Sequence, residues 1–390
     1  MHWESAARQL AAHTTVRPES RWLEPMATTP RHHFVPRWWT RSSGSDGQPV
    51  WNLRDGAADP EQWVRDIYSD TTLVTRVGRH HADHAQPGQF LARQADRYAT
   101  SSSTLPSLVL LMYRSACIAD TSRVLVTTGS GYGTALACSR LGDGQVTSVD
   151  VDPYLVSASQ QRLAAIGHHP RVEVCDLTKT LPDGSYDRIV STVAVPTVPT
   201  AWLDALAPGG RLVTTIARTG LIIIADKKAD GGATGYVGSE PAGFMSARYG
   251  EDYDNFLPDD SQEWQHAWHA EGETTTGRFP LTYVPDTWDV RSTLELLLPG
   301  IEHRQHTTDD GVRTVLMLHE DGSWARAAAP TRRELPTVHQ GGPRRLWDEL
   351  DRIRTWLVID GDLPIRGAAV TITAKGAVTF SRKGWSATIG

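Results

Sequence analysis

The chain has 390 residues, of which 39% are hydrophobic and 22% charged, and its net charge is −6 at neutral pH. This composition is that of a folded globular protein, and the acidic balance argues against a broad nucleic-acid-binding face. No apolar stretch is long enough to cross a membrane, and the N-terminus lacks a signal-peptide pattern. The three cysteines match neither a disulfide framework nor a zinc pattern. We therefore expect a cytoplasmic protein with no membrane or nucleic-acid partner and no bound metal.

In the first hundred residues the sequence predicts short helices up to about residue 45, a helix over 59–69 and an extended stretch over 71–77. A helix is also predicted over 104–118, where apolar residues recur at helical spacing and Pro106 suits a first turn. Strands are then expected at 124–126, 146–149, 172–174, 188–192 and 211–216, and helices at 134–141, 153–165 and 201–206. Such alternation predicts a parallel, doubly wound α/β sheet.

After residue 282 the pattern becomes a mixture of helices and strands. Helices are expected at 291–298 and 344–358, and strands at 314–319, 368–374 and 377–383. The last two runs are joined by Lys375 and Gly376, a turn signal. We therefore expect three parts: an N-terminal helical and extended segment over 1–100, a Rossmann-like domain over 101–230, and an α+β domain over 231–390.

The run from 124 to 152 is shaped to hold a nucleoside, because a strand enters a glycine turn, a helix follows, and a second strand ends on an acid. Gly129 and Gly131 fit the first two glycines of a dinucleotide loop, but Thr134 stands at the third. The loop alone therefore suits either a dinucleotide or S-adenosylmethionine. Asp150 follows Gly129 by about 20 residues, the offset of an acid that binds ribose hydroxyls. The alternative for Asp150 is that it caps the next helix.

Asp176 follows the third predicted strand and is expected to accept a hydrogen bond from the adenine amino group, with Leu177 packed on the ring. Taken alone, an aspartate after a strand is more often a turn residue. The glycine loop, Asp150 and Asp176 would all lie at the carboxyl edge of the sheet, where such folds bind ligands.

Four segments together resemble the protein-L-isoaspartate O-methyltransferase family. They are PRHHFVP at 30–36, YSD at 68–70, SSTLPSLV at 102–109 and LAPGGRLV at 206–213. The resemblance implies the class I methyltransferase fold and S-adenosylmethionine as cofactor. It implies a cofactor site made by Thr128, Gly129, Ser130, Gly131, Asp150, Val151, Asp176 and Leu177.

The sequence departs from the family pattern at two places. The acid and glycine that usually precede the loop are Leu125 and Thr127 here, or Val126 stands opposite the acid if one residue is deleted. The second departure is Thr104, where the family carries serine. The first departure bears on cofactor affinity and the second on catalysis.

Thr104 is the residue that we expect to be catalytic. A carboxylate is already ionised at neutral pH, so its methylation needs positioning rather than a general base. A threonine hydroxyl can aim the carboxylate with one hydrogen bond, as serine does; the alternative is that Thr104 only caps the following helix. His33, Ser103 and Thr192 are expected to contact the substrate.

The second half resembles isoaspartyl-methyltransferase homologues that accompany ribosomal peptide maturation, on the segments GSWARAAA at 322–329 and QGGPRRLWDELDRIRTWL at 340–357. This implies methylation of an aspartate side chain in a precursor peptide that an ATP-grasp ligase or another maturase has modified, followed by aspartimide formation. The C-terminal part would then recognise the peptide. The alternatives are repair of isoaspartyl residues, a non-catalytic peptide-binding homologue and, more remotely, an NAD-dependent enzyme.

Two further features allow two interpretations each. The chain has 14 tryptophans against 6 phenylalanines, and core packing explains them more simply than anchoring of a peptide. His80, His81 and His84 suggest metal ligands, but without a cysteine or a helical pattern nearby we expect a solvated loop.

Overall fold

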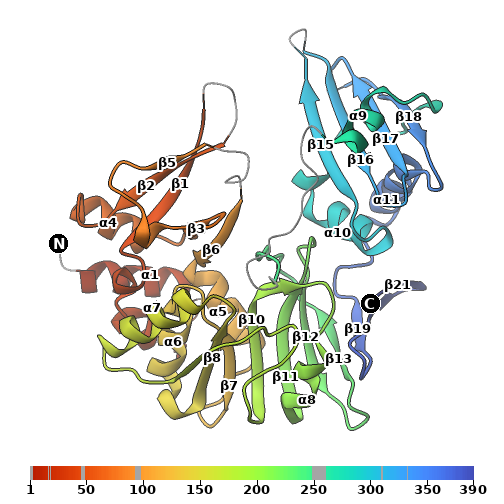
Figure 1. Cartoon of the computed structure of the whole chain (residues 1–390). Helices are drawn as coiled ribbons and strands as arrows, with labels where there is room; N and C mark the ends of the chain where they lie inside the picture. Colours follow the sequence, from red (N-terminus) through yellow and green to blue (C-terminus); the bar gives the residue numbers. More distant parts are fainter. Residues whose placement is uncertain are drawn as a thin grey trace.

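The computed structural model describes residues 3–390 except 16, 18, 45–48, 93–97, 248–260, 309–310 and 332. The described residues form three β-sheets of six, ten and five strands. Figure 1 shows the ten-stranded sheet, the central sheet of the fold, in the lower half of the view, with the six-stranded sheet above its left part and the five-stranded sheet above its right part. Within the described part, no helix is long and apolar enough to cross a membrane.

The N-terminal part begins with three helices and continues into the six-stranded sheet, whose order is β4-β3-β1-β2-β5 with β6 paired to β3. Its elements are α1 (Trp3–Thr14), α2 (Leu23–Thr28), α3 (Arg31–Phe34), β1 (Arg37–Ser43), β2 (Pro49–Asp55), α4 (Pro60–Ile67), β3 (Leu73–Val77), β4 (His80–His81), η1 (Ala82–His84), β5 (Phe90–Leu91) and β6 (Ala99–Ser103). The helices expected up to residue 45 therefore end earlier, and β1 takes their place. Trp38 and Trp39 belong to different buried clusters because neighbouring strand residues face opposite sides.

The parallel half of the central sheet confirms the predicted doubly wound pattern. It consists of β7 (Val124–Thr127), β8 (Val146–Asp150), β9 (Arg171–Val174), β10 (Tyr186–Val195) and β11 (Leu206–Ile216). The helices are α5 (Pro106–Ser115), α6 (Tyr132–Leu141), η3 (Asp143–Gln145), α7 (Pro153–Ala164) and α8 (Thr200–Ala205). The strand order β9-β8-β7-β10-β11 reverses direction at β7, which creates the switch point where such sheets bind ligands.

The central sheet continues with antiparallel strands from two distant stretches of sequence. They are β12 (Ile222–Lys227), β13 (Ala233–Val237), β19 (Ala369–Ile372), β20 (Val378–Arg382) and β21 (Trp385–Ile389). Because β12, β13 and β19 are paired side by side, residue 231, the expected domain boundary, lies inside this sheet. Residues 238–368 are thus an insertion between two neighbouring strands.

The insertion contains the five-stranded antiparallel sheet, whose strand order is β14-β18-β17-β16-β15. Its elements are α9 (Gln262–His269), β14 (Glu273–Thr276), η4 (Val284–Asp286), α10 (Trp288–Leu297), β15 (Glu302–Thr307), β16 (Arg313–Leu318), β17 (Trp324–Ala329), β18 (Thr337–Gly341) and α11 (Leu346–Asp360). One buried cluster runs from Ile189 in β10 through Leu294 in α10 to Met317 in β16. The inserted sheet therefore shares a hydrophobic core with the central sheet.

The tryptophans mostly serve the core, as the simpler interpretation predicted. Those with at most 6% of their surface exposed include Trp22, Trp38, Trp39, Trp51, Trp202, Trp264, Trp324 and Trp347. The helix expected at 344–358 is α11, and it buries Leu346, Leu350 and Ile353 against the inserted sheet. The structure therefore gives α11 a role in packing the core.

The β19–β20 hairpin turn provides a test of how the last strands dock. Gly376 has φ +88°, and a Cβ there would lie 2.2 Å from the Val198 carbonyl oxygen; Gly384, in the next turn, has φ +80° and open space around it. We expect Gly384→Ala to lower the free energy of unfolding by about 1 kcal/mol through backbone strain alone. Gly376→Ala should cost about 1–3 kcal/mol more because the turn must move away from Val198. Urea unfolding measures both losses, and equal losses would contradict the close docking.

Candidate active site

A cavity lies at the carboxyl ends of β7, β8 and β10 and is bordered by β6. Of the residues that we expected to bind cofactor or substrate, it brings together Thr104, Gly129, Asp150, Val151, Leu177 and Thr192. A smaller adjoining cavity is lined by Ser103, Thr128 and Ser130, and it shares Thr104, Gly129 and Thr192 with the first. The two cavities therefore unite residues from both predicted groups at the switch point of the sheet.

The glycine loop connects β7 to α6 through two residues with positive φ. Gly129 has φ +52° and Gly131 has φ +90°, and a Cβ on Gly131 would lie 2.7 Å from the Ser159 hydroxyl. Glycine is thus required at Gly131 both by its backbone angle and by the close approach of α7. Below the loop, Ser148 is hydrogen-bonded to the hydroxyls of Thr128 at 2.6 Å and Thr134 at 2.8 Å. Thr134, at the position of a third glycine, fills the space between helix and sheet.

Asp150 ends β8 with its carboxylate directed at the glycine loop. The backbone N–H of Gly129 donates to Asp150 Oδ2 and that of Asp152 donates to Oδ1, each at 3.0 Å. The helix cap of α7 is Asp152, which accepts from the Tyr154 N–H, so the alternative role considered for Asp150 belongs to Asp152. Asp150 therefore faces the cavity in an orientation that two backbone donors fix.

Asp176 lies next to the cavity without being part of its lining. Its Oδ1 accepts hydrogen bonds from the N–H and the hydroxyl of Thr178, and Lys179 Nζ lies 2.9 Å from Oδ2. Leu177, the next residue, does line the cavity. Asp176 thus has the geometry of a turn residue in this structure, and its contact with adenine stays a prediction.

Thr104 stands just before α5, and the structure removes its alternative role as a helix cap. The cap position is Leu105, and no side chain at that position caps the helix. Two residues of the loop between α4 and β3 accept hydrogen bonds from the start of α5 instead. Asp70 Oδ1 accepts from the Ser107 N–H at 2.9 Å, and Thr72 Oγ1 accepts from the Leu105 N–H at 3.2 Å. Thr104 lines both cavities, and in the described part of the chain no hydrogen bond engages its hydroxyl.

The position of Thr104 is set by Arg31, which belongs to the PRHHFVP segment. The Arg31 guanidinium is fully buried and donates to the backbone carbonyls of Ile67, Ser69, Thr71, Ser103 and Thr104. Burial lowers its pKa to about 10, so it stays charged at neutral pH. Arg31 therefore joins the loop that caps α5 to the strand end that presents Thr104.

The three residues expected to contact substrate have different positions. Ser103 is buried beside the smaller cavity, and the Thr192 hydroxyl is 2.7 Å from that of Thr127, another lining residue. His33 is exposed on α3 and lines neither of these cavities. Its neighbour His32 packs among aromatic rings and contacts Tyr68 Oη through Nδ1 at 2.6 Å. The PRHHFVP segment therefore acts through Arg31 rather than through a histidine in the cavity.

Part of the lining could not be anticipated from sequence. One unpredicted part of the cavity wall is the segment 243–247, whose Met245 carbonyl accepts from the Ala194 N–H at 2.8 Å. The other is the run of hydroxyl residues Thr100, Ser101 and Ser102 on β6. Segment 243–247 carries no motif, and its pairing with β10 holds it at the cavity.

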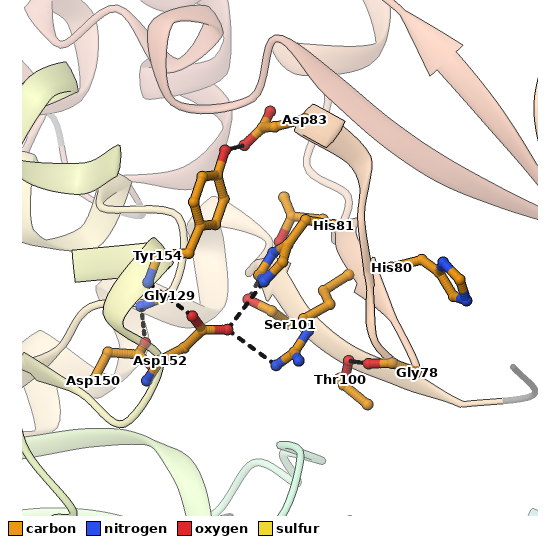
Figure 2. A network of polar contacts seen from close by, with 12 residues as sticks. Gly78, His80, His81, Asp83, Thr100, Ser101, Gly129, Asp150, Asp152 and Tyr154 are labelled. Carbon is orange, nitrogen blue, oxygen red and sulfur yellow. Dashed lines mark hydrogen bonds and ion pairs between the residues drawn. The ribbon is translucent and has the colours of Figure 1, made fainter. Parts of the chain in front are cut away.

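The histidine segment is not the solvated loop that the sequence suggested. His80 and His84 are exposed, but the His81 side chain has only 9% of its surface exposed and its Nε2 lies 3.0 Å from Asp152 Oδ2 (Figure 2). The ring of His81 also packs on Tyr154. The expectation of a solvated loop was wrong because it could not include a carboxylate 71 residues away.

One group of potential metal ligands occurs among the described residues, away from the residues that line the cavities. The ligand atoms of Cys138, Asp143 and His168 lie within 4.8 Å of one another. The Asp143 oxygens already accept from His168 Nδ1 at 2.8 Å and from the His169 N–H at 2.5 Å. These contacts account for the cluster as a helix-end hydrogen-bond network.

Comparisons with known proteins agree with this geometry. The profile of the protein-L-isoaspartate(D-aspartate) O-methyltransferase family matches residues 81–239. Protein-L-isoaspartate O-methyltransferase 1 of Anaeromyxobacter sp. (strain Fw109-5) is 35% identical over 177 residues, 43% of this chain and 76% of the relative. This chain belongs to the protein-L-isoaspartate O-methyltransferase family.

Two other similarities extend the picture of this family member. The protein-L-isoaspartate O-methyltransferase of Synechococcus sp. (strain JA-2-3B'a(2-13)) is 35% identical over 204 residues, 52% of this chain and 64% of the relative. A solved structure of a protein-L-isoaspartate O-methyltransferase aligns with 99% of this chain and 98% of its own, with TM-score 0.50 and 16% identity. At that identity the alignment shows the fold alone.

The family membership fixes the class of chemistry. The chain has the class I methyltransferase fold with additional sheets, it is a carboxyl O-methyltransferase, and its cofactor is S-adenosylmethionine. The residues at the cavity fit that cofactor, since the Asp150 carboxylate at the end of β8 faces the glycine loop and can accept hydrogen bonds from ribose hydroxyls. This chemistry excludes the NAD-dependent alternative.

Asp150 gives the first test of the cofactor site in this family member. We expect Asp150→Ala to raise the Kd of S-adenosylhomocysteine at least about tenfold, because a charged acceptor for the ribose is lost. Asp176→Ala is the matched comparison and should weaken binding less, since Thr178 and Lys179 already engage that carboxylate. Isothermal titration calorimetry measures both, and an unchanged Kd for Asp150→Ala would remove Asp150 from the site.

Proposed function

We propose that this family member methylates an aspartate side chain in a ribosomally made, modified precursor peptide, and that the ester leads to an aspartimide. The observation that carries the proposal is that Thr104, expected to orient the acceptor, and Asp150, expected to bind the cofactor, line the same cavity. The part of the cavity around Thr104, where the methyl acceptor would bind, is lined largely by hydroxyl residues, among them Thr72, Thr127 and Thr192. Hydroxyls orient a carboxylate without needing to remove a proton.

In this proposal the chain orients the acceptor and excludes water. When bound, S-adenosylmethionine supplies an electrophilic methyl group that a carboxylate oxygen takes over while the carbon–sulfur bond breaks. Thr104 donates one hydrogen bond to the other carboxylate oxygen and so aims the attacking oxygen in line. In the ester, the following backbone nitrogen attacks the side-chain carbonyl, loses its proton and expels methanol, which gives the five-membered ring.

The insertion of residues 238–368 is the proposed site of peptide recognition, within the C-terminal part that begins at 231. Segment 243–247, at its start, lines the cavity and would contact the peptide next to the reacting aspartate. We propose a precursor peptide, cyclised by an ATP-grasp ligase or another maturase, as the partner, in the cytoplasm. The resemblance of residues 322–329 and 340–357 to peptide-maturation homologues supports this assignment.

The second candidate function is repair of isoaspartyl residues in damaged proteins. It is favoured by the family profile and by relatives such as that from Anaeromyxobacter sp., which carry the name protein-L-isoaspartate O-methyltransferase. Both functions use the same cofactor and transfer the methyl group to the same kind of acceptor, a carboxylate. The acceptor peptide therefore decides between them.

A competition between acceptors tests the proposed substrate. We expect the enzyme to methylate an aspartate in a side-chain-cyclised peptide, and mass spectrometry should then show loss of one water relative to the starting peptide. The linear peptide of the same sequence and a short isoaspartyl peptide are the matched controls and should react at least about tenfold more slowly. Rapid, sequence-tolerant methylation of the isoaspartyl peptide would instead establish repair.

Thr104 provides the test of the orienting hydroxyl. Thr104→Ala should lower kcat about a hundredfold, because a misaligned carboxylate no longer attacks in line. The Kd of S-adenosylhomocysteine should change less than about twofold, as the hydroxyl is aimed at the acceptor. Thr104→Ser keeps the hydroxyl and should retain most of the turnover. If Thr104→Ala turns over as fast as the unchanged protein, Thr104 has no part in catalysis.

A further inference from the structure

The segment His80–His84 packs against the start of α7, the helix that follows the cofactor-binding strand β8. His81 Nε2 and Arg76 Nη1 each lie 3.0 Å from Asp152 Oδ2, and the three side chains are at most 10% exposed (Figure 2). Arg76 comes from β3 and His81 from β4, both strands of the N-terminal sheet. Two hydrogen-bond-donating groups of the N-terminal sheet thus converge on the carboxylate of Asp152, at the start of α7.

Asp152 connects this contact to the helix. Its Oδ1 accepts the Tyr154 N–H at 2.9 Å and so caps α7, while Oδ2 accepts from Arg76 and contacts His81. Burial raises the pKa of Asp152, but the hydrogen bond from His81 and the charges of His81 and Arg76 outweigh it and hold the pKa near 2. The carboxylate is therefore ionised throughout the neutral range, and its position is fixed from both sides.

The backbone of Asp152 reaches the cofactor site directly. Its N–H donates to Asp150 Oδ1 at 3.0 Å, and the Gly129 N–H donates to Asp150 Oδ2 at the same distance. Figure 2 shows His81, Asp152, Asp150 and Gly129 as one continuous chain of contacts. A displacement of the Asp152 side chain would move its N–H, and with it the carboxylate that lines the cavity.

A second set of contacts holds the same segment to α7 independently. Asp83 Oδ2 accepts from Tyr154 Oη at 2.8 Å and from Arg162 Nη2 at 2.6 Å. The ring of His84 also packs on Tyr154, with the two ring centroids 4.2 Å apart. Removal of His81 alone therefore leaves the segment attached, so its effect on Asp152 can be measured separately.

We propose that His81 is a positioning residue of the cofactor site, which acts through Asp152 to aim the Asp150 carboxylate at the cofactor ribose. This role rests on the assignment of Asp150 to the ribose. Through this role β3 and β4 of the N-terminal sheet support the cofactor site, although Arg76, His81 and Asp152 do not line the cavity themselves.

The test compares variants of the full chain by calorimetry with S-adenosylhomocysteine and by steady-state kinetics. His81→Ala should raise the Kd about tenfold, because a hydrogen bond to a buried charge is lost, and should raise KM for S-adenosylmethionine with kcat nearly unchanged. His81→Gln places an amide donor where Nε2 was and should restore most of the affinity. His84→Ala removes only packing on Tyr154 and should bind like the unchanged protein.

The pairing with Asp150 is tested by a double-mutant cycle. In an Asp150→Ala background, His81→Ala should weaken binding by less than about twofold, because the residue through which it acts is gone. Asp152→Asn keeps a side chain that caps helices well and should weaken binding as His81→Ala does, which provides a second variant if His81→Ala does not fold.

Several outcomes would overturn the proposal. Additive losses in the double variant, or a lowered Tm of His81→Ala with an unchanged Kd, would show that His81 only attaches the N-terminal sheet. If His81→Gln and His81→Ala raise the Kd of S-adenosylhomocysteine equally, the hydrogen bond to Asp152 is not what positions Asp150. Failure of the unchanged protein to bind S-adenosylhomocysteine would contradict the proposed function itself, and with it this role.

Discussion

The buried guanidinium of Arg31 is the interaction on which the acceptor side of the active site depends. Burial of a charge is costly unless the charged group is hydrogen-bonded, and here five backbone carbonyls from two separate segments accept from its two terminal nitrogens, Nη1 and Nη2. These carbonyls can converge only if the loop after α4 and the end of β6 lie against α3. Once they do, Asp70 and Thr72 reach the start of α5, and Thr104 is left to face the cavity. The planar fork of arginine suits this task in a way that lysine does not.

The cofactor side depends on local features, and these could be predicted from the sequence. Strand and helix periods, the two glycines with positive φ and the acid at the end of β8 are properties of short segments, and each appears where it was predicted. Contacts between distant segments could not be predicted in this way. The pairing of β13 with β19, the wall formed by residues 243–247 and the contact of His81 with Asp152 each join residues far apart in the chain.

Two residues show why a motif alone does not place a side chain. His33 belongs to one of the four segments that together suggested the family, yet it is Arg31 of that segment that carries the structural role. Asp176 follows a strand as an adenine-binding acid would, but its carboxylate is engaged by Thr178 in its own turn. For His33 the sequence identified the right segment, but the short helix α3 places its side chain away from the cavities. For Asp176 the engaging residue belongs to the same turn, and its contact with adenine stays a prediction.

The insertion between β13 and β19 constrains how the inserted sheet can meet a substrate. Tyr236 pairs with Ala369, so the two ends of the insertion leave the central sheet on adjacent strands, about 5 Å apart. The shared core through α10 further limits the orientation of the inserted sheet relative to the switch point. Residues 243–247, near the start of the insertion, line the cavity together with β6 of the N-terminal sheet. An acceptor bound there would contact both the N-terminal sheet and the start of the insertion, so part of the selectivity for a peptide can lie in the cavity itself.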